Sequence, residues 1–528
     1  MQKHPISAPG AAVSTTSGAK TPPFCTWAAG LAPFVQKYGY FCIMDCMKQR
    51  LTAVMLALAV SAGASDAFAQ DAAWRQSITQ YIESQVNNGP LKGAVVGVCA
   101  MEIDGKVIAA YNSSTRMVPA SNMKLVTTGA ALRAFGPEYR FETGIGYKGS
   151  IGEDGTLHGD VYIIGGGDPT IGAADSTAYK AEALFWKWKS LLAEAGIKRI
   201  DGNVVGDGSA WEGGLENIGW EYGDVWTYYA AGSSALSFYE NTIDLEVSAG
   251  AKVGDPVNMV QAYPETPWLQ IENCGTTGPA GSGNSLLMQT SDLSSKAVLT
   301  GTYAIDRRPK KEQAANKYGA LTCAHEFYKN LLATGWEVTG TYKAGADEKV
   351  TLIGHTQSPA LAQICRKTNY DSDNFYAEAL FRAMGEAATG IAVYDSCLVA
   401  INEVLDDIVP GKASGIVQKD GSGLSRAGNV SPEWMAGYLT AMSGNKAFVE
   451  SLPRPGEGTL TVLKNLTPWK FRIKSGSMGG VLCYSGYVLD AEGKPVRTFA
   501  VMTNNLGCKL PEARRSLEQL MLLLARHN

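Results

Sequence analysis

The amino-acid sequence predicts an α/β (α+β) fold in which an antiparallel sheet flanked by helices is interrupted by a strand-rich insertion. The two ends of the chain share a helix-rich texture, whereas residues 141–355 show short strand patterns separated by Gly, Asp and Pro, with one helical stretch near 181–195. The 528 residues also exceed the roughly 100 to 200 of one ordinary domain. We therefore expect one domain formed by residues 70–140 and 356–528, with one or more accessory domains inserted at 141–355.

The first elements of the outer domain follow from hydrophobic spacing. Apolar residues over 74–86 recur every three or four positions, which predicts an amphipathic helix. Residues 93–103 and 106–111 have strand patterns, and Asp104-Gly105 between them is a strong hairpin-turn signal.

The remaining elements of the outer domain are three helices and a strand pair. We expect the helices at 123–135, 375–384 and 511–526, and the strand pair within 481–503. Leucines at 517, 520, 523 and 524 line one side of the last helix, which predicts that this side packs on a core.

The amino terminus has the pattern of an export signal. Two basic residues, an apolar run over 51–60 and the triplet Ala67-Phe68-Ala69 follow one another, which is the order of a Sec signal peptide. The run is about half of the roughly 20 residues that span a bilayer, so cleavage after Ala69 is favoured over an anchor. We expect a leader at 1–69 with its signal peptide at 47–69, and a periplasmic or secreted protein with no stable membrane span.

Charge and cysteine content exclude several classes of protein. The net charge of −4 gives no nucleic-acid footprint. Ten cysteines are scattered, seven of them after the predicted cleavage site, and no two form a CxxC pair. This pattern argues against a zinc framework and leaves structural disulfides and buried thiols both open.

A serine nucleophile needs a base, and histidine is scarce here. The five histidines are at 4, 158, 325, 355 and 527, and no GxSxG motif occurs. A lysine kept neutral by burial and by a nearby positive charge can replace histidine. Ser-x-x-Lys places both groups on one helix face and occurs at Ser17, Ser121 and Ser443. Only Ser121, with Lys124, opens an apolar helix just after a hairpin.

Two further polar motifs follow in the chain. Ser-x-Asn occurs at Ser282, Ser372 and Ser443, but only Ser372-Asp373-Asn374 leads directly into a helical run. Lys474-Ser475-Gly476 is the single Lys-Ser/Thr-Gly match and precedes Ser477 and an apolar strand. Such short matches arise by composition, but the three in this order characterise active-site-serine penicillin-recognising enzymes.

The chain resembles the class C low-molecular-mass penicillin-binding proteins, the D-alanyl-D-alanine carboxypeptidase/endopeptidase family. The similarity also covers the following segments: 119–128 (PASNMKLVTT), 162–170 (YIIGGGDPT), 202–207 (GNVVGD), 372–378 (SDNFYAE) and 420–426 (DGSGLSR). The resemblance implies a serine β-lactamase/penicillin-binding-protein-like peptidase domain, with inserted domains between the first two motifs.

The family's residue roles carry over onto matching positions. Ser121 would form the acyl-enzyme and Lys124 would take its proton. Ser372 and Asn374 would relay a proton to the leaving D-alanine and hold the substrate amide. Lys474 would anchor the terminal carboxylate and help to keep Lys124 neutral.

Further residues would bind substrate. The backbone N–H groups of Ser121 and Ser477 would form the oxyanion hole, Ser475 would lie near the terminal carboxylate, and Gly476 would also belong to the substrate-binding residues. Ser475 departs from the commoner Thr but keeps the hydroxyl. Asp224 would face the amine of the stem peptide's diamino acid, although an aspartate among aromatics is otherwise a helix cap or a turn residue.

The resemblance implies a D-Ala-D-Ala carboxypeptidase, with DD-endopeptidase activity left open. Its partners would be peptidoglycan stem peptides and β-lactam antibiotics, and no cofactor, metal or nucleic acid is expected. Two alternatives remain at this point: a β-lactamase or esterase of the same fold, and a non-catalytic wall-binding homologue.

Four other patterns have weaker functional readings. The GxGxxG match at 144–149 lies in a strand context without the following helix that a dinucleotide site needs. Residues 165–168 are interpreted as a tight turn, and residues 420–423 as an ordered loop bordering the active site. Trp186 and Trp188 are expected to pack in a core, with an exposed glycan-contacting pair as the alternative.

Overall fold

The computed structural model describes residues 52, 72–291, 293–411, 413–468 and 470–526. Apart from Thr52, the predicted leader and its signal peptide lie outside the described residues. The unit that begins at Ala73 is described below.

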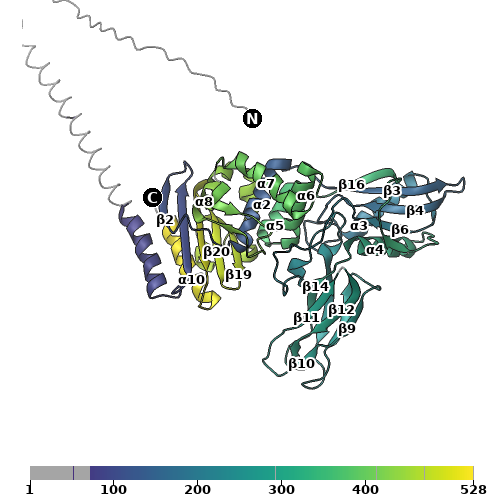
Figure 1. The fold of residues 1–528 in the computed structure, drawn as a ribbon, viewed down its shortest axis with the longest axis horizontal. Coiled ribbons are helices and arrows are strands. Elements are labelled where there is room, and N and C mark those ends of the chain that lie inside the picture. Colours follow the sequence, from purple (N-terminus) through teal and green to yellow (C-terminus); the bar gives the residue numbers. More distant parts are fainter. Residues whose placement is uncertain (1–51, 53–71, 292, 412, 469, 527–528) are drawn as a thin grey trace, which may run out of the picture. The chain divides into compact units, whose positions relative to one another are not determined.

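A five-stranded antiparallel sheet combines strands from the N-terminal and C-terminal parts of the outer domain (Figure 1). Its strands, in spatial order, are β19 (Phe471–Met478), β20 (Val481–Leu489), β21 (Pro495–Asn504), β1 (Val95–Glu102) and β2 (Val107–Tyr111). The β1–β21 pairing brings segments about 400 residues apart into one ladder. The predicted hairpin and strand pair are therefore present, and Gly105 takes the positive φ of 89° that the hairpin turn requires.

Helices cover both faces of this sheet. Because successive side chains on a strand point to opposite faces, each strand packs on helices on both sides. On one face, Val96 and Val98 pack with Leu517 and Leu520 of α10 (Leu510–Ala525) and with the helix over residues 72–87. On the other face, Cys99 and Met101 pack on α8, a helix over Pro432–Met442.

A group of helices surrounds α2 (Met123–Phe135), every residue of which is buried from Met123 to Leu132. The other helices are α5 (Leu361–Tyr370), α6 (Asn374–Thr389), α7 (Tyr394–Ile408) and α9 (Lys446–Ser451). They share with α2 and α8 one large apolar core, so the predicted serine-bearing helix lies at the centre of this body.

The first part of the insertion is a six-stranded mixed sheet packed against two helices. Its strands are β3 (Glu142–Ile151), β4 (Thr156–Ile164), β5 (Arg199–Asp201), β6 (Val204–Asp207), β15 (Tyr342–Ala344) and β16 (Thr351–Gln357). The helices are α3 (Ala181–Glu194) and α4 (Gly319–Ala333). The prediction of a single helix in the insertion is wrong, because α4 packs Cys323, Phe327 and Leu331 on this sheet. The GxGxxG match lies within β3.

The second part of the insertion consists of short strands with their own apolar core. The strands are β7 (Thr242–Ser248), β8 (Asn258–Tyr263), β9 (Gln270–Asn273), β10 (Thr276–Gly278), β11 (Leu287–Ser291), β12 (Ser294–Thr300), β13 (Thr302–Ala304) and β14 (Lys310–Ala315). They form two three-stranded sheets and one pair.

Several sequence expectations concern single residues or single helices. Within the described chain, all seven cysteines are free thiols, and five of them are buried. Trp188 is fully buried but Trp186 is 65% exposed, so the expectation that both pack in a core is wrong for Trp186. Among the described residues, no single helix has the length and apolar composition of a membrane span; α6 and α7 reach both only as a pair bent by 82°.

Candidate active site

The predicted nucleophile lies in a tight turn at the start of α2. Ser121 is the middle residue of a 3₁₀ turn over Ala120–Asn122, and Ala120 has a φ of 47°. A left-handed non-glycine residue costs about 1 to 2 kcal/mol, so the surrounding contacts must hold this turn. The buried Asn122 amide donates to Ser485 Oγ of β20 at 2.8 Å. The turn thereby fixes Ser121 at the edge of the core.

Lys124 is the base candidate closest to this serine. Its side chain is completely buried, and Nζ lies 3.0 Å from Ser121 Oγ, 2.6 Å from Asn374 Oδ1 and 2.9 Å from Ser422 O. Burial lowers the pKa of Lys124 to about 8, against the opposing effect of nearby carboxylates. The amine is therefore partly neutral near physiological pH.

The hydrogen bonds of a neutral Lys124 leave its lone pair for the serine. A neutral amine has two N–H donors and one lone pair, and a carbonyl oxygen can only accept. Asn374 Oδ1 and Ser422 O take both donors, so the lone pair is left for the Ser121 hydroxyl. Asn374 itself is oriented because its Nδ2 donates to the Tyr229 carbonyl at 2.8 Å.

The loop over residues 420–425 is held by two buried carboxylates. Glu378 accepts from the backbone N–H groups of Gly421 and Ser422, at 3.1 and 2.8 Å. Asp420 accepts from the backbone N–H groups of Gly423 and Ser425, at 2.8 and 2.6 Å. Burial is the largest cause that raises the pKa of both carboxyls, that of Glu378 to about 7. These contacts aim the Ser422 carbonyl at the catalytic lysine, and the loop does border the site as interpreted from sequence.

Sequence reasoning assigned no role to either carboxylate. Both lie in segments that carry the family resemblance, and Glu378 follows Asn374 by one helical turn. An acidic residue on the buried face of a predicted helix is the signal that could have identified Glu378, because such a group needs partners.

The second polar motif lies at the start of α6. Asp373 caps this helix by accepting from the Tyr376 N–H at 3.0 Å, and Ser372 before it has a φ of 61°. This backbone directs the Ser372 hydroxyl to Lys474, whose Nζ donates to it at 2.8 Å. The structure thus brings together Ser121, Lys124 and Asn374 in one group, and Ser372 and Lys474 in a second.

The third motif is on strand β19. Gly476 lets this strand approach the nucleophile turn, since a Cβ there would lie 2.4 Å from the Pro119 carbonyl oxygen. Lys474 is fully buried and its pKa is lowered well below the usual value, first by burial and then by the charge of Lys124. Ser475 Oγ lies 2.8 Å from Thr459 Oγ1. For Lys124, the predicted effect of burial is the largest cause of the lowered pKa, whereas the predicted neighbouring cation is not among the causes.

A cleft of about 450 Å³ opens onto the nucleophile. Its lining includes Ser121, Asn374 and Ser477 on one side and the segment around Asp224 on the other. Asp224 is half-buried, and its Oδ1 accepts from the Tyr229 hydroxyl at 2.9 Å. The described residues contain no cluster of three or more metal-ligand side chains.

The mouth of the cleft carries an ion pair. Arg426 Nε lies 2.6 Å from Glu221 Oε1, and Arg426 Nη1 donates to the Gly479 carbonyl at 3.1 Å. Arg426 therefore joins the Asp224 side of the cleft to the end of β19.

A serine beside a buried lysine, with a second lysine on the adjoining sheet edge, defines the class of serine hydrolases that work through an acyl-enzyme. A family model, the D-Ala-D-Ala carboxypeptidase 3 (S13) family, matches residues 78–527. The chain belongs to this family of serine-type D-Ala-D-Ala carboxypeptidases.

Individual relatives agree with this assignment. The D-alanyl-D-alanine carboxypeptidase of Actinomadura sp. (strain R39) is 28% identical over 467 residues, covering 84% of each chain. D-alanyl-D-alanine carboxypeptidase DacB of Haemophilus influenzae is 26% identical over 426 residues, covering 77% of this chain and 84% of that protein.

A solved structure shares the fold. The crystal structure of penicillin binding protein 4 (dacB) from Haemophilus influenzae superposes with a TM-score of 0.70 at 24% identity, over 84% of this chain and 97% of that one. The same protein has been crystallised with a β-lactam. The prediction of a penicillin-binding-protein-like α/β fold with strand-rich additions is confirmed.

Proposed function

We propose that this protein removes the terminal D-alanine of peptidoglycan stem peptides through an acyl-enzyme on Ser121. The observation that carries the proposal is the hydrogen-bond arrangement of Lys124, whose two carbonyl partners leave its lone pair for the serine 3.0 Å away. A base of pKa about 8 is matched to proton transfer near neutral pH.

The reaction would run in two halves. Ser121 Oγ bonds to the carbonyl carbon of the penultimate D-alanine while its proton passes to Lys124. The C–N bond then breaks: the departing amine takes a proton from the Ser372 hydroxyl, which Lys474 contacts, and the proton held by Lys124 passes to Ser372 to replace it. In the second half, water attacks the ester carbon and gives a proton to Lys124, which passes it to the departing Ser121 oxygen, so that the serine hydroxyl and the neutral lysine are both restored. The N–H groups of Ser121 and Ser477 would stabilise the oxyanion in both halves.

Lys474 would bind the carboxylate of the terminal D-alanine. Burial and the charge of Lys124 both lower the pKa of Lys474 and so disfavour its protonated form. The substrate carboxylate would raise this pKa again and form an ion pair with Lys474. Asp224, which is half-buried in the lining of the cleft, would face the diamino-acid amine.

Benzylpenicillin labelling followed by peptide mass spectrometry tests the proposal. We expect one stable adduct, on Ser121, and release of D-alanine from pentapeptide muropeptides. An adduct on another residue, or none, would overturn the assignment of the nucleophile. Rapid turnover of the adduct would instead favour a β-lactamase, and cleavage of crosslinked dimers would add DD-endopeptidase activity, which uses the same acyl-enzyme.

We also propose that the protein is exported. The basic, apolar and small-residue segments over 47–69 support removal of a signal peptide and release into the periplasm or outside the cell. Amino-terminal sequencing of the mature protein should begin at Gln70; a start well before Gln70 would contradict this.

A further inference from the structure

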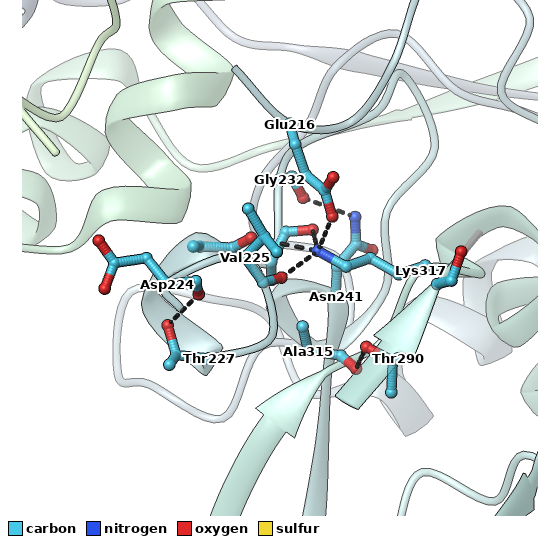
Figure 2. Close-up of polar contacts among 12 residues, drawn as sticks. Glu216, Asp224, Val225, Thr227, Gly232, Asn241, Thr290, Ala315 and Lys317 are labelled. Atoms are coloured by element: carbon cyan, nitrogen blue, oxygen red, sulfur yellow. Dashed lines mark hydrogen bonds and ion pairs between the residues drawn. The ribbon is translucent and has the colours of Figure 1, made fainter. Parts of the chain in front are cut away.

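A buried lysine in the insertion contacts the segment that carries Asp224. Lys317 lies between β14 and α4, and its side chain is 1% exposed. Its Nζ donates to the carbonyls of Val225, Ala230 and Ala231 at 2.8, 3.2 and 3.3 Å (Figure 2). It also pairs with Glu216 Oε1 at 2.6 Å. One ammonium group therefore ties together both ends of residues 216–231.

The contacts of Lys317 bracket the functional part of this segment. Val225 directly follows Asp224, and Ala230 directly follows Tyr229. Around them, the Ala315 N–H donates to the Trp226 carbonyl at 3.1 Å. The segment has only one short 3₁₀ turn, over Tyr228–Ala230, so its shape depends on turn hydrogen bonds within 217–227 and on tertiary contacts. Among these contacts, Asn217 and Trp220 hold the first part of the segment to residues 419–420, and Lys317 contacts the part that carries Asp224 and Tyr229.

Two links lead from this segment to the chemistry. The Tyr229 carbonyl accepts from Asn374 Nδ2 and so turns Asn374 Oδ1 toward Lys124. The Tyr229 hydroxyl donates to Asp224, and in Figure 2 the Asp224 carboxylate points away from Lys317. A shift of the backbone at 225–231 would disturb both links together.

We propose that Lys317 is a positioning residue that holds this segment so that Tyr229 orients Asn374 and Asp224 faces the substrate. The expected effect on kinetics rests on the proposed function, whereas the claim that Lys317 holds the segment does not. A buried cation needs several acceptors to offset its lost hydration, and here those acceptors are the backbone of the cleft wall. The insertion would thus shape the active site through a buried residue that does not line the cleft.

Hydrogen exchange and kinetics of Lys317→Met test the proposal. Met fills a similar volume but donates no hydrogen bond, so amides over 224–231 should exchange at least about tenfold faster, while α2 exchanges as in the wild type. The kcat/KM for a pentapeptide with a free diamino-acid amine should fall about tenfold. The preference for this peptide over its N-acetylated form should fall with it.

Two further variants keep the test decisive. Glu216→Gln removes only the charge partner, whose side chain is 38% exposed, so the fold should survive and the same effects should appear at about threefold. Lys343→Met, which breaks an exposed pair with Asp160, is the matched control and should leave 224–231 exchange and the peptide preference unchanged.

The outcomes separate this inference from the proposed function. Wild-type exchange at 224–231 and wild-type peptide preference in both Lys317→Met and Glu216→Gln would overturn the role of Lys317, whatever the enzyme's substrate. Failure of the wild-type protein to be labelled at Ser121 would overturn the proposed function, and the exchange experiment would still decide whether Lys317 holds the segment.

Discussion

The two sides of the cleft are built in opposite ways. On one side, Ser121 and Lys124 lie three residues apart at the start of a buried helix, so the local backbone sets most of their geometry. On the other side, residues 216–231 depend on tertiary contacts, among them those of a lysine about 90 positions away in the chain. On the chemical side, the start of one helix presents both the nucleophile and the base, although Asn374 and Ser422 bind Lys124 from distant segments. The side that we propose to recognise substrate belongs to the insertion. Mutations on the first side should therefore change acylation, whereas mutations on the second side should change the recognition of peptide.

Removing the nucleophile should give the largest effect and should affect only the chemical side. Ser121→Ala should lower kcat by about 10⁴-fold or more, because no acyl-enzyme can form, and should abolish benzylpenicillin labelling. Ser443→Ala is the matched control, since Ser443 also begins a Ser-x-x-Lys sequence but only caps α8; labelling should persist. A labelled Ser121→Ala protein would contradict the assignment.

The acylation rate should depend on pH through Lys124. Only the neutral amine accepts the serine proton, and its pKa is about 8, so the neutral fraction falls about tenfold per pH unit below that value. The second-order rate constant for benzylpenicillin should thus drop about 50-fold from pH 8 to pH 6 and level off above pH 9. Stopped-flow measurements check this, and a flat profile between pH 6 and 8 would exclude Lys124 as the base.

The same contrast between local and distant contacts explains what the sequence could predict. The three motifs, the serine-bearing helix and the terminal strands are local patterns, and the structure contains all of these elements. Helix α4 was missed because polar residues alternate with apolar ones along its stretch, although Cys323, Phe327 and Leu331 recur every four positions.

Long-range polar contacts could not be predicted from the sequence. No spacing links Lys317 to the carbonyls at 225–231, and none links Glu378 to the loop over 420–425. Each contact exists only once the chain has brought separate elements together. Every residue type offers the same backbone carbonyl and N–H groups, so even a charge that the sequence shows to be buried does not reveal its backbone partner. The roles of the motif residues themselves stay predictions until acylation is measured.

The close approach of Gly423 to the Ala120 carbonyl tests whether the geometry of the Ser121 turn depends on contacts with a distant segment. Gly423 has a φ of 78°, and a Cβ there would lie 2.1 Å from the Ala120 carbonyl oxygen. Gly423→Ala should therefore cost about 3 kcal/mol of stability, combining backbone strain with a clash, and slow acylation by displacing the turn. Gly390 has a φ of 72° with open space around its Cβ position, so Gly390→Ala should show only the strain, about 1 kcal/mol. If thermal unfolding showed equal losses of stability in the two variants, the loop over residues 420–425 would be able to move away from Ala120 without cost.

Neutralising Asp224 should give the smallest effect and should affect only recognition. Asp224→Asn keeps the shape of the side chain but loses an ion pair with the substrate amine, so KM for the free-amine pentapeptide should rise about tenfold. Glu221→Gln should change KM by less than about threefold, because Glu221 is exposed and already paired with Arg426. Benzylpenicillin carries no such amine, so its acylation rate and pH profile should match the wild type in Asp224→Asn. If that variant slowed penicillin acylation as much as peptide cleavage, the two sides of the cleft would not be separable, and Asp224 would act on the chemistry through Tyr229 and Asn374.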